Sequence, residues 1–133
     1  MSVQAIAKGV NISPRKVAVV AGLVRGRTVS DAITILENTP RRAALQVKKT
    51  VMSARANAEH NHNFKPSTLK IVEITVTPGR RLKRFKPAAM GRALPYQLKS
   101  SHIKVVVDGE KRVPKKSASA EEKPVKKIEE EAK

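Results

Sequence analysis

The stretch "GRRLKRFKPAAMGRALPY" (Gly79–Tyr96) decides how the rest of the chain must fold. It contains six Arg or Lys residues and no acidic residue, with Phe85 near its middle, two prolines and two glycines. Its charge is too high for a hydrophobic core, and its prolines and glycines interrupt any helix. The flanking sequence must therefore provide the elements that hold this segment. The positive charge of the segment indicates the kind of partner that it binds.

Two β-branched segments flank this stretch and are typical of strands. They are "TLKIVEITVT" (Thr68–Thr77) and "HIKVVVDG" (His102–Gly109). If they pair antiparallel, about 25 residues lie between them, whereas a hairpin loop usually has roughly 2–5. If the ladder continues on both sides, each side adds about 11 residues at ~3.3 Å, and the hairpin projects on the order of 35 Å. We call residues 77–101 the arm and expect it to become ordered against a partner, because a bare two-stranded ribbon is marginally stable.

The first of the two flanking strands contains a break in its alternation. Leu69 and Ile71 lie in one phase, whereas Val72, Ile74 and Val76 lie in the other. This slip predicts either a β-bulge or a segment that is buried on both faces.

The N-terminal half predicts a short strand followed by two helices. Alternation over Val3–Lys8 is typical of a strand. Ser13 is expected to cap the first helix with Pro14 at its first position, and Gly26 to end it. The sequence "TVSD" (Thr28–Asp31) resembles a capping box that opens a second helix.

The third predicted helix, Pro40–His60, is the best marked, with Thr39 as its expected N-cap. Apolar residues recur along it at three- and four-residue spacing and predict one buried face. These residues are Ala44, Val47, Val51, Ala54 and Ala58.

Together these elements predict an α+β domain over residues 1–113, with the arm included. From residue 114 to residue 133 the composition is low-complexity Lys, Glu, Ala, Ser and Pro, which predicts a disordered tail.

The charge of the chain points to a polyanion as its partner. The formal net charge is +17 among 133 residues, and no acidic residue occurs from Ile74 to Val107. Nucleic acid is the expected polyanion, and we expect no membrane partner because the chain has neither a spanning segment nor a long basic amphipathic helix. The chain contains no cysteine, and its first residues lack the pattern of a signal peptide, which fits the cytosol.

Catalytic chemistry has little support in the sequence. His60 and His62 form an H-x-H pair without Cys or carboxylate ligands nearby, and a polar loop explains them better than a metal site. The sequence shows neither a clustered pair of acids nor a Gly-rich phosphate loop. We therefore expect a protein that is not an enzyme and that needs no cofactor or metal.

Several motifs resemble the family of large-subunit ribosomal protein twenty-two, in the family's order and spacing, over about Val3 to Val107. The motifs are "ISPRK" (12–16), "VRGR" (24–27), "SARANAEHN" (53–61), "LKRFKPAAMGRA" (82–93) and "SSHIKVVV" (100–107). The resemblance implies three helices packed on a small three-stranded antiparallel sheet, with a long protruding β-hairpin. It also implies a structural protein of the large ribosomal subunit that binds large-subunit rRNA, bridges rRNA domains during assembly and lines the polypeptide exit tunnel with its hairpin.

The implied partners are large-subunit rRNA, neighbouring large-subunit proteins and, transiently, the nascent polypeptide, in a cytoplasmic ribosome and without homo-oligomerisation. The family often has Pro where Arg80 stands and a basic residue where Ala88 and Met90 stand, so the tip of this arm is less charged. Hairpin changes in the family are associated with macrolide resistance.

The residues that we expect to contact rRNA combine the basic residues of the body with those of the arm. Phe85 could either stack on an unpaired base or pack against the ribbon itself. The expected contact residues are Arg15, Lys16, Arg25, Arg27, Lys48, Lys49, Arg55, Arg80, Arg81, Lys83, Arg84, Phe85, Lys86, Arg92 and Lys99. The residues expected at the tunnel-lining tip are Pro87, Ala88, Ala89, Met90 and Gly91.

One alternative fits the same composition. An architectural DNA-binding protein also combines small size, helices and a basic β-arm with a proline at its tip. Such proteins usually dimerise through a large apolar interface, and this sequence shows no surplus apolar face.

Overall fold

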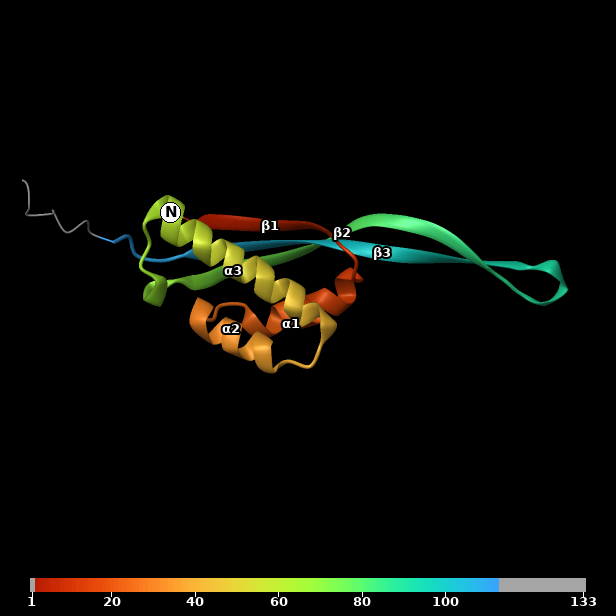
Figure 1. Cartoon of the computed structure of the whole chain (residues 1–133), viewed down its shortest axis with the longest axis horizontal. Helices are drawn as coiled ribbons and strands as arrows, with labels where there is room; N and C mark the ends of the chain where they lie inside the picture. Colours follow the sequence, from red (N-terminus) through yellow and green to blue (C-terminus); the bar gives the residue numbers. More distant parts are fainter. Residues whose placement is uncertain (1, 113–133) are drawn as a thin grey trace, which may run out of the picture.

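Three strands form one antiparallel sheet in the order β1-β3-β2, and two of them extend far beyond the third (Figure 1). The computed structural model describes residues 2–112. The strands and α-helices are β1 (Val3–Val10), α1 (Pro14–Val24), α2 (Val29–Asn38), α3 (Arg42–His62), β2 (Lys70–Pro87) and β3 (Ala93–Asp108), with 3₁₀ turns η1 (Pro66–Thr68) and η2 (Ala89–Gly91). Three helices and this sheet confirm the predicted α+β fold.

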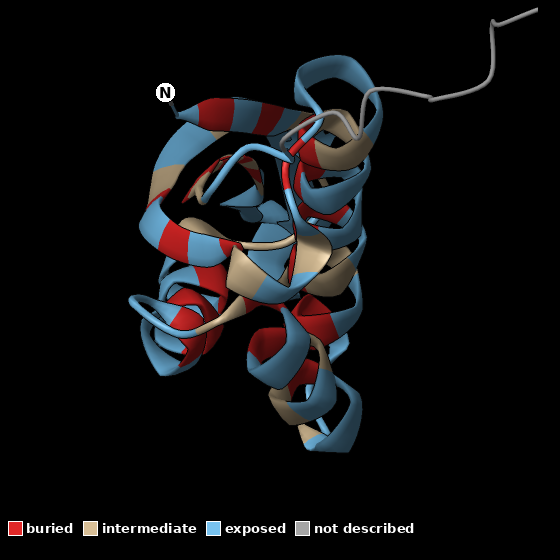
Figure 2. Cartoon of the chain, turned by 90° about the vertical axis from the view of Figure 1, so that its left-hand side faces the viewer, coloured by how far each residue is buried: buried red, intermediate tan, exposed pale blue. Residues whose placement is uncertain are grey.

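Helices α1 and α3 cover one face of the sheet, α2 packs against both of them, and the core lies between the sheet and the helices. Along β3, the buried Ile103, Val105 and Val107 alternate with half-buried residues on the opposite face. All five residues of the apolar stripe predicted for the third helix are buried. In Figure 2 the buried positions, in red, accordingly alternate with exposed ones along the strands and helices. The small side chains of this stripe allow α3 to approach the sheet closely, so the core is densely packed with few aromatic residues.

The break in alternation of β2 is a β-bulge. The pairing of β2 with β3 shifts register between Ile71 and Glu73, and the extra residue, Val72, is 59% exposed. Because the bulge inserts one residue, both Ile71 and Ile74 are buried on the same face of the sheet. The first of the two interpretations drawn from the sequence is thus confirmed.

The loop between α1 and α2 protects the outer edge of β2. Gly26 donates its backbone N–H to the carbonyl of Ile71 at 3.1 Å, and Ile71 donates to the carbonyl of Arg27 at 2.9 Å. Gly26 has φ +75°, a left-handed conformation that glycine adopts without strain. The loop therefore pairs with backbone groups that an edge strand would otherwise expose.

The ends of several elements differ from the sequence prediction. The third helix begins at Arg42 instead of Pro40, and its N-cap is Arg41. Thr39 instead ends α2, where its hydroxyl donates to the carbonyl of Ile35 at 2.7 Å. The third helix also continues to His62, two residues further than predicted.

Two other capping predictions are confirmed in position. Ser13 is the N-cap of α1 with Pro14 at the first turn, although its side chain makes no capping hydrogen bond. The hydroxyl of Thr28 accepts a hydrogen bond from the N–H of Asp31 at 3.2 Å, which is one half of a capping box. The predicted tail, residues 114–133, lies outside the described residues.

Candidate nucleic-acid interface

The arm is a regular antiparallel ribbon that continues the sheet beyond β1. Its paired residues run from Arg81 opposite Lys99 to Pro87 opposite Ala93. The last pair between β1 and β3 is Val10 with Ser101, so the arm projects without support from the third strand (Figure 1). No residue from position 80 to position 99 is buried. The ribbon therefore exposes both of its faces to a partner.

Cross-strand pairing separates the side chains of the arm into two faces, because directly opposite residues share a face. Leu82 faces Leu98, Arg84 faces Tyr96, and Lys86 faces Leu94 on one side. The Lys86 ammonium lies over the Tyr96 ring, 5.5 Å from its centroid, in a cation–π arrangement. This face is therefore a line of aliphatic and aromatic side chains that also carries two cations.

The other face carries Arg81 opposite Lys99, then Lys83 opposite Gln97, then Phe85 opposite Pro95. The Phe85 ring is 71% exposed. A ring exposed to this extent is available for stacking on a base.

The tip is a short turn that is closed by backbone hydrogen bonds. The Ala88 N–H donates to the carbonyl of Arg92 at 2.8 Å. Met90 has φ +58° and Gly91 has φ +71°, and the Met90 side chain is 92% exposed. The turn thus presents an apolar side chain at the far end of an otherwise cationic arm.

A bulge marks the root of the arm. The register shifts between Pro78 and Arg81, and the hydroxyl of Ser100 donates to the carbonyl of Arg80 at 2.6 Å. A Cβ on Gly79 would lie 2.7 Å from the Ser100 hydroxyl oxygen and 3.2 Å from the His102 ring. The strands can therefore approach this closely only with glycine at that position.

In the body, Arg25 and Arg27 hydrogen-bond to the protein itself. Arg25 donates to the carbonyl of Ile74 at 3.1 Å, and Arg27 donates through Nε to the carbonyl of Leu23 at 3.1 Å. Both arginines remain exposed, so each guanidinium retains donors that face solvent.

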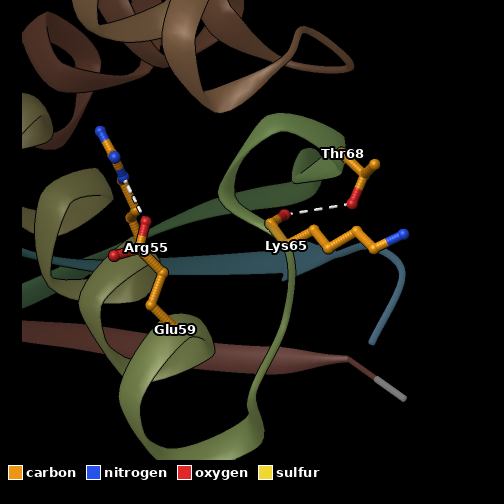
Figure 3. A network of polar contacts seen from close by, with 4 residues as sticks. All are labelled: Arg55, Glu59, Lys65 and Thr68. Atoms are coloured by element: carbon orange, nitrogen blue, oxygen red, sulfur yellow. Dashed lines mark hydrogen bonds and ion pairs between the residues drawn. The ribbon is translucent and has the colours of Figure 1, made fainter. Parts of the chain in front are cut away.

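The basic residues of α3 differ in how they are engaged. Lys48 forms an ion pair with Glu37 at 2.8 Å. Arg55 forms one with Glu59 at 2.7 Å, which Figure 3 shows. Lys49 is exposed and has no ion pair within residues 2–112. A phosphate must compete with a carboxylate at two of these three positions.

The structure also brings together cations that the sequence analysis did not select. Lys16, which was selected, lines a depression with Arg41 and Arg42, and Arg42 lines a second depression with Lys8. Arg15, also selected, is exposed beside Lys16 at the start of α1. In the sequence, Arg41 and Arg42 are visible only as a basic pair at the start of a helix. They lie near Lys16 because α1 and α3 pack together.

The described residues do not gather the groups of a metal centre. Within residues 2–112 no cluster of three or more His, Cys, Asp or Glu side chains could hold an ion. His62 instead lies beside Phe64, with ring centroids 6.3 Å apart. Among the helices of the described part, none has the length and apolar character needed to cross a membrane.

A comparison with known protein families finds a family model that matches most of the chain. The model of the family described as "Ribosomal protein L22p/L17e" matches residues 5–108. The match extends from within β1 to the end of β3 and includes the entire arm.

Proposed function

Because the chain belongs to the ribosomal protein L22p/L17e family, we propose that it binds large-subunit rRNA through its arm and body and lines the polypeptide exit tunnel with the tip of its arm. Membership of this family supports a structural role in the large ribosomal subunit, and it agrees with the resemblance noted in the sequence. The family match therefore favours rRNA binding over the DNA-binding alternative.

The observation that carries the proposal is the exposed arm. Its arginines and lysines lie on both faces, and no acidic residue occurs from Ile74 to Val107. Without a partner, the repulsion between these charges opposes the ribbon, and phosphates on either side would remove that repulsion. An arm that passes between RNA segments would satisfy both faces at once.

Arm and body together would also explain a role in assembly. The arm is a long antiparallel ribbon that starts from a body with its own basic surface, so one molecule can hold RNA segments that are separate in sequence. We propose that this bridging of rRNA domains helps the large subunit to assemble, with neighbouring large-subunit proteins as further partners and a single copy of the chain in each subunit.

The tip has the composition expected of a surface that faces a passage. Pro87, Ala88, Ala89 and Gly91 are small or compact, and Met90 is flexible and nearly fully exposed. Apolar groups of this kind offer a nascent polypeptide transient contacts without a strong binding site.

Equilibrium binding to deproteinised large-subunit rRNA tests the first part of the proposal. Affinity should fall linearly on a log–log plot against salt, with a slope of about −0.7 to −0.9 for each phosphate neutralised. A flat response to salt, or equal affinity for duplex DNA of the same length, would contradict rRNA binding as the function.

A cryo-electron-microscopy map of large subunits that contain this chain tests the tunnel. Density for residues 87–91 should reach the tunnel wall. Density for the arm on the outer surface of the subunit would overturn the proposed tunnel-lining role while leaving rRNA binding intact.

A further inference from the structure

Two depressions lie side by side where the loop after β1 meets the start of α3. The first, of about 420 Å³, is lined by Lys16, Arg41 and Arg42 together with residues of the loop. The second, of about 380 Å³, lies between the end of β1 and α3 and is lined by Lys8 and Arg42. Asn11 and Ile12 line both depressions, so the two lie next to each other at this loop.

A third depression borders the same loop at the root of the arm. It has a volume of about 430 Å³ and is lined by Arg80 and Lys99 from the arm and by Gly9 and Asn11 from the loop. Gly9 also lines the second depression. We call the three depressions together the basic channel, because six cations and no acidic residue line them.

The loop that forms the centre of the channel is held in place by the sheet. Gly9 has φ +72° and donates its N–H to Nδ1 of His102 at 2.9 Å. Ile12 donates to the carbonyl of Val10 at 2.7 Å, and Val10 still pairs with Ser101 after the bulge. The channel is therefore preformed, and a ligand need not order this loop on binding.

The starts of two helices add to the positive potential beside the channel. Both α1 and α3 begin at the end of the body from which the arm projects (Figure 1). Neither has an acidic residue in its first turn, and neither N-cap side chain satisfies a backbone N–H. The positive N-terminal ends of both helix dipoles therefore add to the positive charge of the six side chains.

We propose that one strand of RNA follows the basic channel from the starts of α1 and α3, across the Gly9–Ile12 loop, to the root of the arm. This inference rests on the proposed function and names the path by which the RNA would engage the body and the arm together. Cations spread over three neighbouring depressions match a chain of phosphates better than a single small anion. The lining offers mainly charge, so recognition is through the sugar–phosphate backbone and not through base identity.

The binding experiment uses the full chain and deproteinised large-subunit rRNA over a series of KCl concentrations. The channel variant carries Lys16→Ala, Arg41→Ala and Arg42→Ala. It should bind more weakly than the wild type, and its log–log salt slope should be shallower by about 2, as expected for the loss of three phosphate contacts.

A matched control removes three exposed cations from the opposite end of the sheet. It carries Lys70→Ala, Lys111→Ala and Arg112→Ala and therefore has the same net charge as the channel variant. It should keep nearly the slope of the wild type. Circular dichroism melts of both variants establish that they remain folded.

Photo-crosslinking tests whether a single strand is involved. A benzoylphenylalanine at Gln46, in the second depression, and another at Leu98, in the third, replace neutral residues and leave the cations intact. Both crosslinks should map to the same short segment of rRNA. Crosslinks to segments from different rRNA domains would overturn the single-strand path.

The remaining outcomes separate this inference from the function on which it rests. If the wild type binds with a steep salt slope but the channel and control variants behave alike, the channel is wrong and rRNA binding stands. If the wild type itself shows no salt-dependent binding, the proposed function fails, and the channel fails with it.

Discussion

Shortening the arm should separate stability from binding. The change replaces the residues between Leu82 and Leu98 with an Asn-Gly turn, which closes a two-residue hairpin. No residue of the arm from position 80 to position 99 is buried, and the core lies entirely in the body. Substitutions at exposed positions usually change the free energy of unfolding by about 0.5 kcal/mol or less, and we expect the shortened arm to stay within that range.

The same change removes four cations from the arm: Lys83, Arg84, Lys86 and Arg92. If each neutralises one phosphate, the log–log salt slope for rRNA binding becomes shallower by roughly 3. The melting temperature should shift by less than about 4 °C, since 1 kcal/mol corresponds to about 4–8 °C in a domain of this size.

Differential scanning calorimetry and the rRNA binding titration measure the two effects on the same protein. As a positive control for stability, Ile103→Ala creates a cavity in the core and should cost about 2–5 kcal/mol. If the shortened protein melts as low as Ile103→Ala, or loses its cooperative transition, the division into a self-sufficient body and a binding arm is refuted.

Three other perturbations test single features of the core, the root of the arm and its tip. Ser101→Ala should stabilise the protein by about 1 kcal/mol in urea titrations, because its buried hydroxyl has no partner among residues 2–112; a loss of stability would indicate a missed hydrogen bond. Gly79→Ala should cost about 1 kcal/mol, because its Cβ would displace the Ser100 hydroxyl from its carbonyl acceptor, and an unchanged melting temperature would argue against the close approach. Ala88→Arg with Met90→Arg should alter macrolide sensitivity and nascent-chain passage relative to a Gln pair at the same positions, and unchanged values for both would remove the support for a passage-facing tip.

Local signals predicted most of the fold. The bulge in β2 followed from a slip in alternation around Val72, and the start of α1 followed from Ser13 and Pro14. The hairpin followed from the length and charge of the segment between two strands. These features depend on neighbouring residues alone, so a single sequence contains them.

The features that the sequence did not predict depend on tertiary packing. Thr39 has the composition of an N-cap, but the turn of the chain places its hydroxyl at the end of α2. Arg41 and Arg42 meet Lys16 only because the starts of α1 and α3 pack together beside the loop after β1. The distribution of charge along the sequence cannot show which distant cations come together. The basic channel is therefore visible only in the folded structure.

The outer edge of β2 is paired with the α1–α2 loop near Ile71, but this cover stops short of the arm. Within residues 2–112 the outer edges of the arm therefore carry backbone groups that another strand could pair with, and such edges promote aggregation. Before the chain reaches a ribosome, repulsion between the arms of different copies would oppose that pairing. The arginines and lysines would thus keep the newly made protein soluble as well as bind RNA, and neutralising them should favour precipitation of the free chain at low salt.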